Sequence, residues 1–285
     1  MRVDRYNELY ESFRWDVPER YNIAHGCCGR WAGERSRFAL YWEDESGAAA
    51  AYSFWDIQMA ANRLSNALAA LGVKRGDRVA ILLPQRPETA IAYVAIFQMG
   101  AIALPLSHLF GPEALEYRLE HAGASVAIVE PTTLPNLWAI KDRLGRLRHV
   151  IGVGGARESS VLPWEGLLEK AKAEFECVDT KAEDPSLIIY TSGTTGAPKG
   201  RCTRTASSSA ISRASCTRTT SFRRKAMCSG RPRTGPGRAA SSTRCCRAGI
   251  SASRSSATAA SSNPRRRITC SRNTAFETPS SSRRP

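Results

Sequence analysis

The sequence predicts an α/β fold with a mostly parallel sheet, and three observations support this class. Several short apolar runs, of which residues 78–83 are the clearest, lack polar alternation and therefore indicate strands covered on both faces. The segments between them carry apolar residues at helical spacing. Glycine or proline separates one segment from the next. Strands that alternate with helices are typical of a parallel sheet.

The first elements are predicted from their caps and their apolar spacing. Ser53 can cap a helix, and Gly72 can end it. The apolar stripe of this helix consists of Ile57, Ala60, Ala61, Leu64, Leu68 and Leu71. Strand 78–83 follows, and Pro87 then begins a second helix that is apolar nearly all round and ends at Gly100.

The later elements repeat this pattern. Residues 101–106 form the next predicted strand, and a third helix runs from Pro112 to a glycine stop at Gly123. The charged run 141–148 predicts the solvated face of a short helix. Three further strands and one further helix are predicted at 125–130, 149–153, 186–189 and 164–175. In such folds ligands bind at the carboxyl ends of the strands.

One uncharged stretch is long enough to be considered as a membrane span. Residues 89–111 carry no formal charge, but Gln98, Gly100 and Pro105 interrupt them and no polybasic loop flanks them. A buried helix followed by a buried strand is the expected structure, so no membrane span is predicted. Residues 1–19 alternate acids, arginines and aromatics, and are not expected to be a signal peptide.

The cysteines and histidines of residues 1–200 predict no metal site. Cys27, Cys28 and Cys177 form no paired framework, and His25 beside two adjacent cysteines lacks the usual ligand spacing. His108 and His121 are expected to be structural or solvated. Unpaired cysteines favour a reducing cytoplasm as the compartment.

A Ser/Thr/Gly loop ending in lysine follows the predicted strand 186–189. Its sequence, residues 190–200, is Y-T-S-G-T-T-G-A-P-K-G. Backbone N–H groups, hydroxyls and one ammonium together suit the phosphates of a nucleotide. The loop is not a Walker A motif, because two residues separate Gly196 from Lys199. The run 152–155 also fails the dinucleotide pattern and predicts a turn after a strand.

The composition changes sharply after Gly200. Residues 201–285 hold 19 arginines and lysines against one acidic residue, a net charge of +18, whereas residues 1–200 have a net charge of −3. The same 85 residues contain no Leu, Val, Tyr, Trp or Asp. Such a segment cannot bury enough apolar surface to offset its ordering entropy, so residues 201–285 are expected to be disordered.

The loop resembles the signature of the AMP-forming adenylating enzymes, the superfamily of acyl-CoA synthetases, firefly luciferase and peptide-synthetase adenylation modules. It matches that signature without a gap over eleven residues. Upstream, A-Y-S-F at 51–54, G-D-R-V-A at 76–80 and G-A-I-A-L-P-L at 100–106 are similar to the N-terminal core of the family. On this resemblance, residues 1–200 are a partial AMP-binding domain, the N-terminal part of an acyl-CoA synthetase-like large domain.

The resemblance implies a two-step ligase that uses ATP, Mg²⁺ and coenzyme A. A small carboxylic acid attacks the α-phosphorus of ATP, and a thiol then takes the acyl group from the adenylate. The implied nucleotide-binding residues are Thr191, Ser192, Gly193, Thr194, Thr195, Gly196 and Lys199. Lys199 is also the implied catalytic residue, since its charge would stabilise the departing pyrophosphate. The family's ribose-binding and later motifs are not found in residues 201–285.

Two interpretations of residues 201–285 compete. One is a basic arm that binds nucleic acid through its phosphates, although Phe222 and Phe276 are its only aromatics for base stacking. The other is an out-of-frame translation. If the last base of each codon is read with the first two bases of the next, the shifted frame can encode A-L-H-A-H-R from residue 201. Over the whole segment the shifted frame can encode Leu, Val, Trp and Asp again.

We therefore expect a truncated, inactive portion of an AMP-forming acyl-CoA synthetase, followed by a frameshifted tail. The alternative within enzymes is another adenylating ligase, such as a peptide-synthetase module or an aryl-acid ligase. The alternative of another class is a basic nucleic-acid-binding protein acting through residues 201–285.

Overall fold

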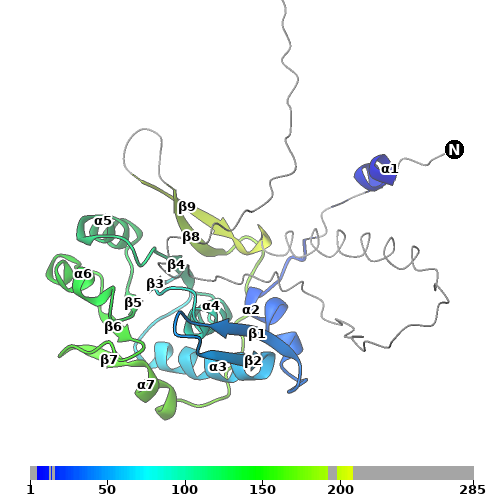
Figure 1. Cartoon of the computed structure of the whole chain (residues 1–285). Coiled ribbons are helices and arrows are strands. Elements are labelled where there is room, and N and C mark those ends of the chain that lie inside the picture. Colours follow the sequence, from blue (N-terminus) through cyan, green and yellow to red (C-terminus); the bar gives the residue numbers. More distant parts are fainter. Residues whose placement is uncertain (1–4, 13, 15–16, 192–197, 208–285) are drawn as a thin grey trace, which may run out of the picture. The chain divides into compact units, whose positions relative to one another are not determined.

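The computed structural model describes residues 5–12, 14, 17–191 and 198–207. Their strands form a seven-stranded sheet in the order β7-β6-β5-β3-β4-β8-β9 and a separate two-stranded sheet (Figure 1). The large sheet consists of β3 (Arg78–Leu82), β4 (Ile102–Pro105), β5 (Val126–Val129), β6 (His149–Gly152), β7 (Val161–Pro163), β8 (Pro185–Thr191) and β9 (Lys199–Arg204). Its neighbours are parallel except for β8 and β9, which are antiparallel. The predicted α/β class with a mostly parallel sheet is confirmed.

Helices cover both faces of this sheet. On one face lie α3 (Phe54–Ala70) and α4 (Pro87–Gln98), and on the other lie α5 (Pro112–Ala122) and α6 (Leu134–Trp138) (Figure 1). Val79 and Ile81 of β3 pack in the first core, whereas Ala80 and Leu82 pack in the second. Both faces of β3 are therefore buried, as its continuous apolar run predicted.

The predicted helix ends of α3 and α5 are confirmed by their caps. The Ser53 hydroxyl accepts a hydrogen bond from the backbone N–H of Asp56, and the Asp56 carboxylate accepts one from the N–H of Ser53, a complete capping box. Pro112 begins α5, and Gly123 ends it with a φ of +64°, in the left-handed region that favours glycine. The caps therefore set the length of each helix independently of its packing.

The uncharged stretch 89–111 forms helix α4 followed by strand β4, as predicted. Gln98 is 2% exposed, and its amide donates to the Ser65 hydroxyl at 2.6 Å while its carbonyl accepts from Gln58 at 2.8 Å. This polar contact fixes how α4 packs on α3. No helix in the described part of the chain is long and apolar enough to cross a membrane.

Two predicted helices are shorter than expected. The run 141–148 contains a single 3-10 turn, η2 (Lys141–Arg143), and α7 (Trp164–Lys170) ends five residues before the predicted end at 175. After α7 the chain is held against α3, because Asn62 and Asn66 donate side-chain hydrogen bonds to the backbone carbonyls of Lys172, Ala173 and Glu174. These carbonyls serve tertiary contacts and are not part of a continued helix.

The predicted order–disorder boundary at Gly200 lies too early. Strand β9 continues to Arg204, and Thr205 is 3% exposed. A strand ladder is made by backbone groups, which all residues except proline carry, so the change of composition does not prevent pairing with β8. Residues 208–285, which hold the rest of the predicted disordered segment, lie outside the described residues.

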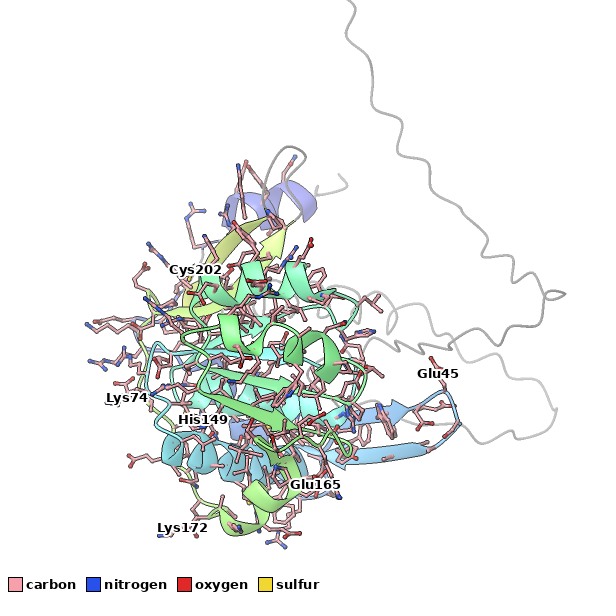
Figure 2. The ribbon with its side chains drawn as sticks, turned by 90° about the vertical axis from the view of Figure 1, so that its left-hand side faces the viewer. Glu45, Lys74, His149, Glu165, Lys172 and Cys202 are labelled. Atoms are coloured by element: carbon pink, nitrogen blue, oxygen red, sulfur yellow. The ribbon has the colours of Figure 1, made fainter. Side chains whose placement is uncertain are left out.

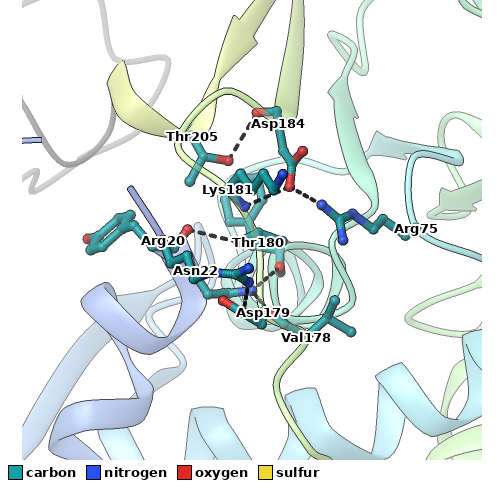
Figure 3. Close-up of polar contacts among 11 residues, drawn as sticks. Arg20, Asn22, Arg75, Val178, Asp179, Thr180, Lys181, Asp184 and Thr205 are labelled. Carbon is teal, nitrogen blue, oxygen red and sulfur yellow. Dashed lines mark hydrogen bonds and ion pairs between the residues drawn. The ribbon is translucent and has the colours of Figure 1, made fainter. Parts of the chain in front are cut away.

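The end of β9 is tied to the segment that leads into β8. The backbone N–H groups of Thr205 and Ala206 donate to the carbonyls of Asp184 and Ala182, and Asp184 also pairs with Arg75 (Figure 3). The same segment contacts residues 20–22, where Asn22 donates to the carbonyl of Val178 (Figure 3). These contacts fasten the β8–β9 hairpin at its base.

Several short elements were not predicted, because none has a long enough apolar pattern to signal itself. They are α1 (Arg5–Ser12), α2 (Ile23–Cys27), η1 (Gly29–Trp31), β1 (Phe38–Glu43), β2 (Ala49–Ser53), α6 and β7. Strands β1 and β2 form the separate antiparallel hairpin, which carries Glu45 at its turn (Figure 2).

Candidate functional site

The predicted phosphate loop connects β8 to β9. Thr191 is the last residue of β8, Lys199 is the first of β9, and the two are paired in the antiparallel ladder. Because β8 is parallel to β4, the two described ends of the loop lie at the carboxyl edge of the sheet, where ligands bind in such folds. The five predicted residues between the strand ends, Ser192, Gly193, Thr194, Thr195 and Gly196, lie outside the described residues.

The two predicted residues that are described, Thr191 and Lys199, are both exposed. Within the described ranges the Lys199 ammonium makes no ion pair or hydrogen bond. Its charge is therefore available to an anion from solvent. Thr191 is paired with Lys199 in the ladder, so a residue with a hydroxyl and one with an ammonium stand side by side at the loop ends.

The stem below the loop is closely packed. Tyr190 is paired with Gly200, and a Cβ added at Gly200 would lie 3.0 to 3.2 Å from three atoms of the Tyr190 side chain. The ring thus lies against the glycine backbone. From α5, Tyr117 and His121 reach the two strands of the stem, through a hydrogen bond to the carbonyl of Pro198 and a contact with the Tyr190 hydroxyl.

A buried arginine lies beside this stem. Arg118 is 8% exposed, its guanidinium lies 4.1 Å from the ring centre of Phe110 and 5.8 Å from that of Tyr190, and it forms no ion pair within the described part of the chain. Its Nη1 donates to the carbonyl of Ala114 at 2.6 Å. Because arginine stays protonated, a positive charge without an ion-pair partner in the described part lies near Tyr190 of the stem, and this favours an anion there.

The neighbouring strand ends carry charges that are already paired. Arg86 after β3 hydrogen-bonds Glu88 and lies 3.7 Å from a carboxylate oxygen of Glu130 after β5, and these partners raise the pKa of Arg86. Gly154, with a φ of +63°, gives the arginine room, since a Cβ there would lie 2.9 Å from its guanidinium. This confirms the predicted turn after β6 and leaves the β8–β9 end as the candidate anion site.

Three of the four cysteines of the described part, Cys27, Cys28 and Cys177, are poor metal ligands. Burial raises the pKa of Cys27 to about 11, that of Cys28 to about 12 and that of Cys177 to about 11. These thiols therefore stay protonated at neutral pH, whereas metals bind the thiolate. Cys202 is exposed on β9 (Figure 2).

Sequence reasoning found the hairpin ends but missed the side chains that support them. Tyr117 carries no motif. His121 was expected to be structural or solvated, and its Nδ1 lies 2.6 Å from the Tyr190 hydroxyl, which is a structural contact. Their position on α5 relative to β8 depends on the tertiary fold. The assignment of residues 191–196 and Lys199 to phosphate binding stays a prediction.

The fold and the loop together define an α/β protein whose sheet is covered by helices on both faces, with a candidate anion site at the carboxyl edge of that sheet. The chain belongs to the AMP-binding enzyme family, which matches residues 30–229. The match extends past Gly200 into the segment where the composition changes.

Curated relatives of this chain are acyl-CoA and acetyl-CoA ligases. An uncharacterized acyl-CoA ligase, YtcI, of Bacillus subtilis is 32% identical over 186 residues, which cover 65% of this chain and 34% of the relative. Acetyl-coenzyme A synthetase of Streptomyces coelicolor is 34% identical over 206 residues, covering 66% of this chain and 31% of the relative. The chain thus spans about a third of the length of these relatives.

The solved structures that this chain resembles are also CoA ligases. The anthranilate CoA ligase AuaEII, in complex with anthranoyl-AMP, superimposes with a TM-score of 0.63 and 28% identity over 67% of this chain and 36% of that protein. An acyl-CoA synthetase from Brucella canis superimposes with a TM-score of 0.63 and 27% identity over 71% of this chain and 38% of its own.

Proposed function

We propose that the gene encodes an AMP-forming acyl-CoA synthetase. The observation that carries this is the Y-T-S-G-T-T-G-A-P-K-G loop, whose described ends lie at the carboxyl edge of a parallel sheet within an AMP-binding family match. A carboxylate oxygen attacks the α-phosphorus of ATP and the bond to pyrophosphate breaks. The sulfur of coenzyme A then attacks the acyl carbon of the adenylate, and AMP leaves.

In the first step the loop would bind the β- and γ-phosphates of ATP. Lys199 contributes an ammonium that has no ion-pair partner among the described residues, and Thr191 contributes a hydroxyl; the two residues are paired at the strand ends. Negative charge grows on the bridging oxygen as pyrophosphate departs, so a fixed positive charge stabilises the transition state more than bound ATP. Mg²⁺ would enter with ATP as the counter-ion of its phosphates; hydroxyl and phosphate oxygens are the hard ligands it prefers.

The acid is proposed to be small or aromatic. Acetyl-CoA synthetases among the relatives favour a small acid, whereas the similarity to an anthranilate CoA ligase favours an aryl acid as the second candidate. We place the enzyme in the cytoplasm, which the free thiols of Cys27, Cys28 and Cys177 support.

We further propose that the reading frame is lost after Gly200 and that the chain as written is inactive. The absence of Leu and Val from residues 201–285, against their abundance in residues 1–200, supports a change of frame. A basic nucleic-acid-binding arm is the competing proposal. The two aromatics of this segment would supply few stacking platforms for bases.

The products of the reaction test this function. A frame-restored protein, supplied with ATP, Mg²⁺, coenzyme A and a panel including acetate and anthranilate, should yield AMP and pyrophosphate together with one acyl-CoA, as followed by chromatography. The chain as written should read background in the same assay. ADP and phosphate as products, or turnover by the chain as written above a buffer blank, would contradict the proposal.

A further inference from the structure

Helix α5 contacts the chain on both sides of the loop, at the end of β8 and just before β9. The Tyr117 hydroxyl donates to the backbone carbonyl of Pro198 at 3.1 Å, and His121 Nδ1 lies 2.6 Å from the Tyr190 hydroxyl. Pro198 immediately precedes Lys199, and Tyr190 immediately precedes Thr191. One helix therefore touches the residue next to each end of the loop.

The two α5 side chains and Tyr190 form one aromatic cluster. The rings of Tyr117 and His121 stack with centroids 5.5 Å apart, and Tyr190 meets both edge-on at 6.4 and 5.8 Å. The Tyr190 hydroxyl also donates to the carbonyl of Arg118 at 3.3 Å. Since that hydroxyl has one proton, both of its contacts are satisfied when His121 Nδ1 carries a proton and donates to the tyrosine oxygen.

The sheet itself gives this end of the hairpin little support. Strand β4 pairs with β8 at Ala103 and Leu187, near the start of β8, so the carboxyl end of β8 extends beyond that pairing. On the other side β9 is the last strand in the order of the described sheet. The α5 cluster is thus the contact that holds the end of the stem.

We propose that Tyr117 and His121 are positioning residues that hold the loop stem on α5 and thereby place Thr191 and Lys199 for the phosphates of ATP. This proposal rests on the proposed function of the loop. Neither residue touches the nucleotide. Each acts through Pro198 or Tyr190, and a Cβ added at Gly200 would lie only 3.0 to 3.2 Å from the Tyr190 side chain.

Hydrogen exchange and the unfolding midpoint are measured on the full 285-residue chain, and the affinity for Mg·ATP is measured on the frame-restored protein. Tyr117→Phe removes the hydroxyl that holds Pro198 but keeps the stacked ring, and His121→Ala removes the partner of Tyr190. His121→Asn is the conservative variant, because an asparagine amide can donate from nearly the position of Nδ1. Tyr41→Phe deletes a hydroxyl on the separate hairpin, at a residue 75% exposed, and serves as the matched control.

The first measurement is hydrogen exchange of backbone amides, with the unfolding midpoint measured beside it. Loss of one hydrogen bond should speed exchange in the stem, residues 188–191 and 199–203, by about fivefold in Tyr117→Phe and at least as much in His121→Ala. Exchange in β3 and β5 and the unfolding midpoint should not change, and His121→Asn should restore the stem. Unchanged stem exchange, or faster exchange throughout the sheet, would overturn the proposal.

The other measurement is the affinity for Mg·ATP by calorimetry. Tyr117→Phe and His121→Ala should weaken it by about 3- to 10-fold, and His121→Asn and Tyr41→Phe should not. Faster stem exchange with unchanged affinity would show that the cluster does not serve the nucleotide. If the unsubstituted frame-restored protein bound no Mg·ATP, the proposed function of the loop would fail, whereas the exchange result would still decide whether α5 holds the stem.

Discussion

Replacing Lys199 by alanine in the frame-restored protein is expected to slow adenylate formation by about 10- to 1000-fold, with a smaller change in ATP affinity. The lysine begins β9, is exposed and makes no ion pair within the described residues, so its charge is free to meet the leaving pyrophosphate. Because negative charge grows as the bond to the α-phosphorus breaks, removing the lysine charge should lower mainly the rate of adenylate formation. Single-turnover adenylation measures it.

Three comparisons make this test specific. Lys172→Ala removes an equal charge from the segment after α7, away from the hairpin, and should leave the rate unchanged (Figure 2). Thr194→Ala and Thr195→Ala each remove a neutral hydroxyl and should raise the activation free energy of adenylate formation by about 1 kcal/mol. If Lys199→Ala formed adenylate at the unsubstituted rate, the assignment of this loop to pyrophosphate departure would be wrong.

Replacing Leu64 by alanine is expected to lower the free energy of unfolding by about 3 kcal/mol. Leu64 is 0% exposed and lies on α3 in the core that also contains Val79 and Ile81 of β3. The substitution removes three carbons and leaves a cavity between helix and sheet, which rigid neighbours fill only in part. Urea denaturation of the full chain, followed by circular dichroism, measures the change.

Leu109→Ala is the matched control, because the same atoms are removed from a residue that is 80% exposed. It should change the free energy of unfolding by less than about 0.5 kcal/mol. Equal losses from the two variants would mean that α3 does not pack on the sheet as described.

The sequence predicted those parts of the fold that have strong local signals. The apolar stripe of α3 and its Ser53 cap, the buried runs of β3 and β5, and the glycine after α5 each set an element independently of the rest. Short elements such as β7 and α6 were missed because three to five residues are too few to show a periodic spacing of apolar residues. The end of α7 was misplaced because Asn62 and Asn66 hold the next residues by tertiary contacts.

The site was predicted only in part. The loop could be found from its residues, because hydroxyls, glycines and a lysine in that order suit phosphate binding. The supporting side chains could not, since Tyr117 and Tyr190 are 73 positions apart in the sequence and meet only when α5 packs beside β8. The early boundary at Gly200 had a different cause: composition predicts burial, whereas β9 forms through backbone hydrogen bonds.

The DNA around and beyond codon 200 tests the central claim most directly, namely that this chain begins an AMP-forming ligase and then leaves its reading frame. Read one base earlier from codon 201, the sequence should encode A-L-H-A-H-R, stay open well past codon 285 and continue with the remainder of a ligase. A stop codon within the first few dozen shifted codons would contradict the claim and would favour residues 201–285 as a genuine basic segment.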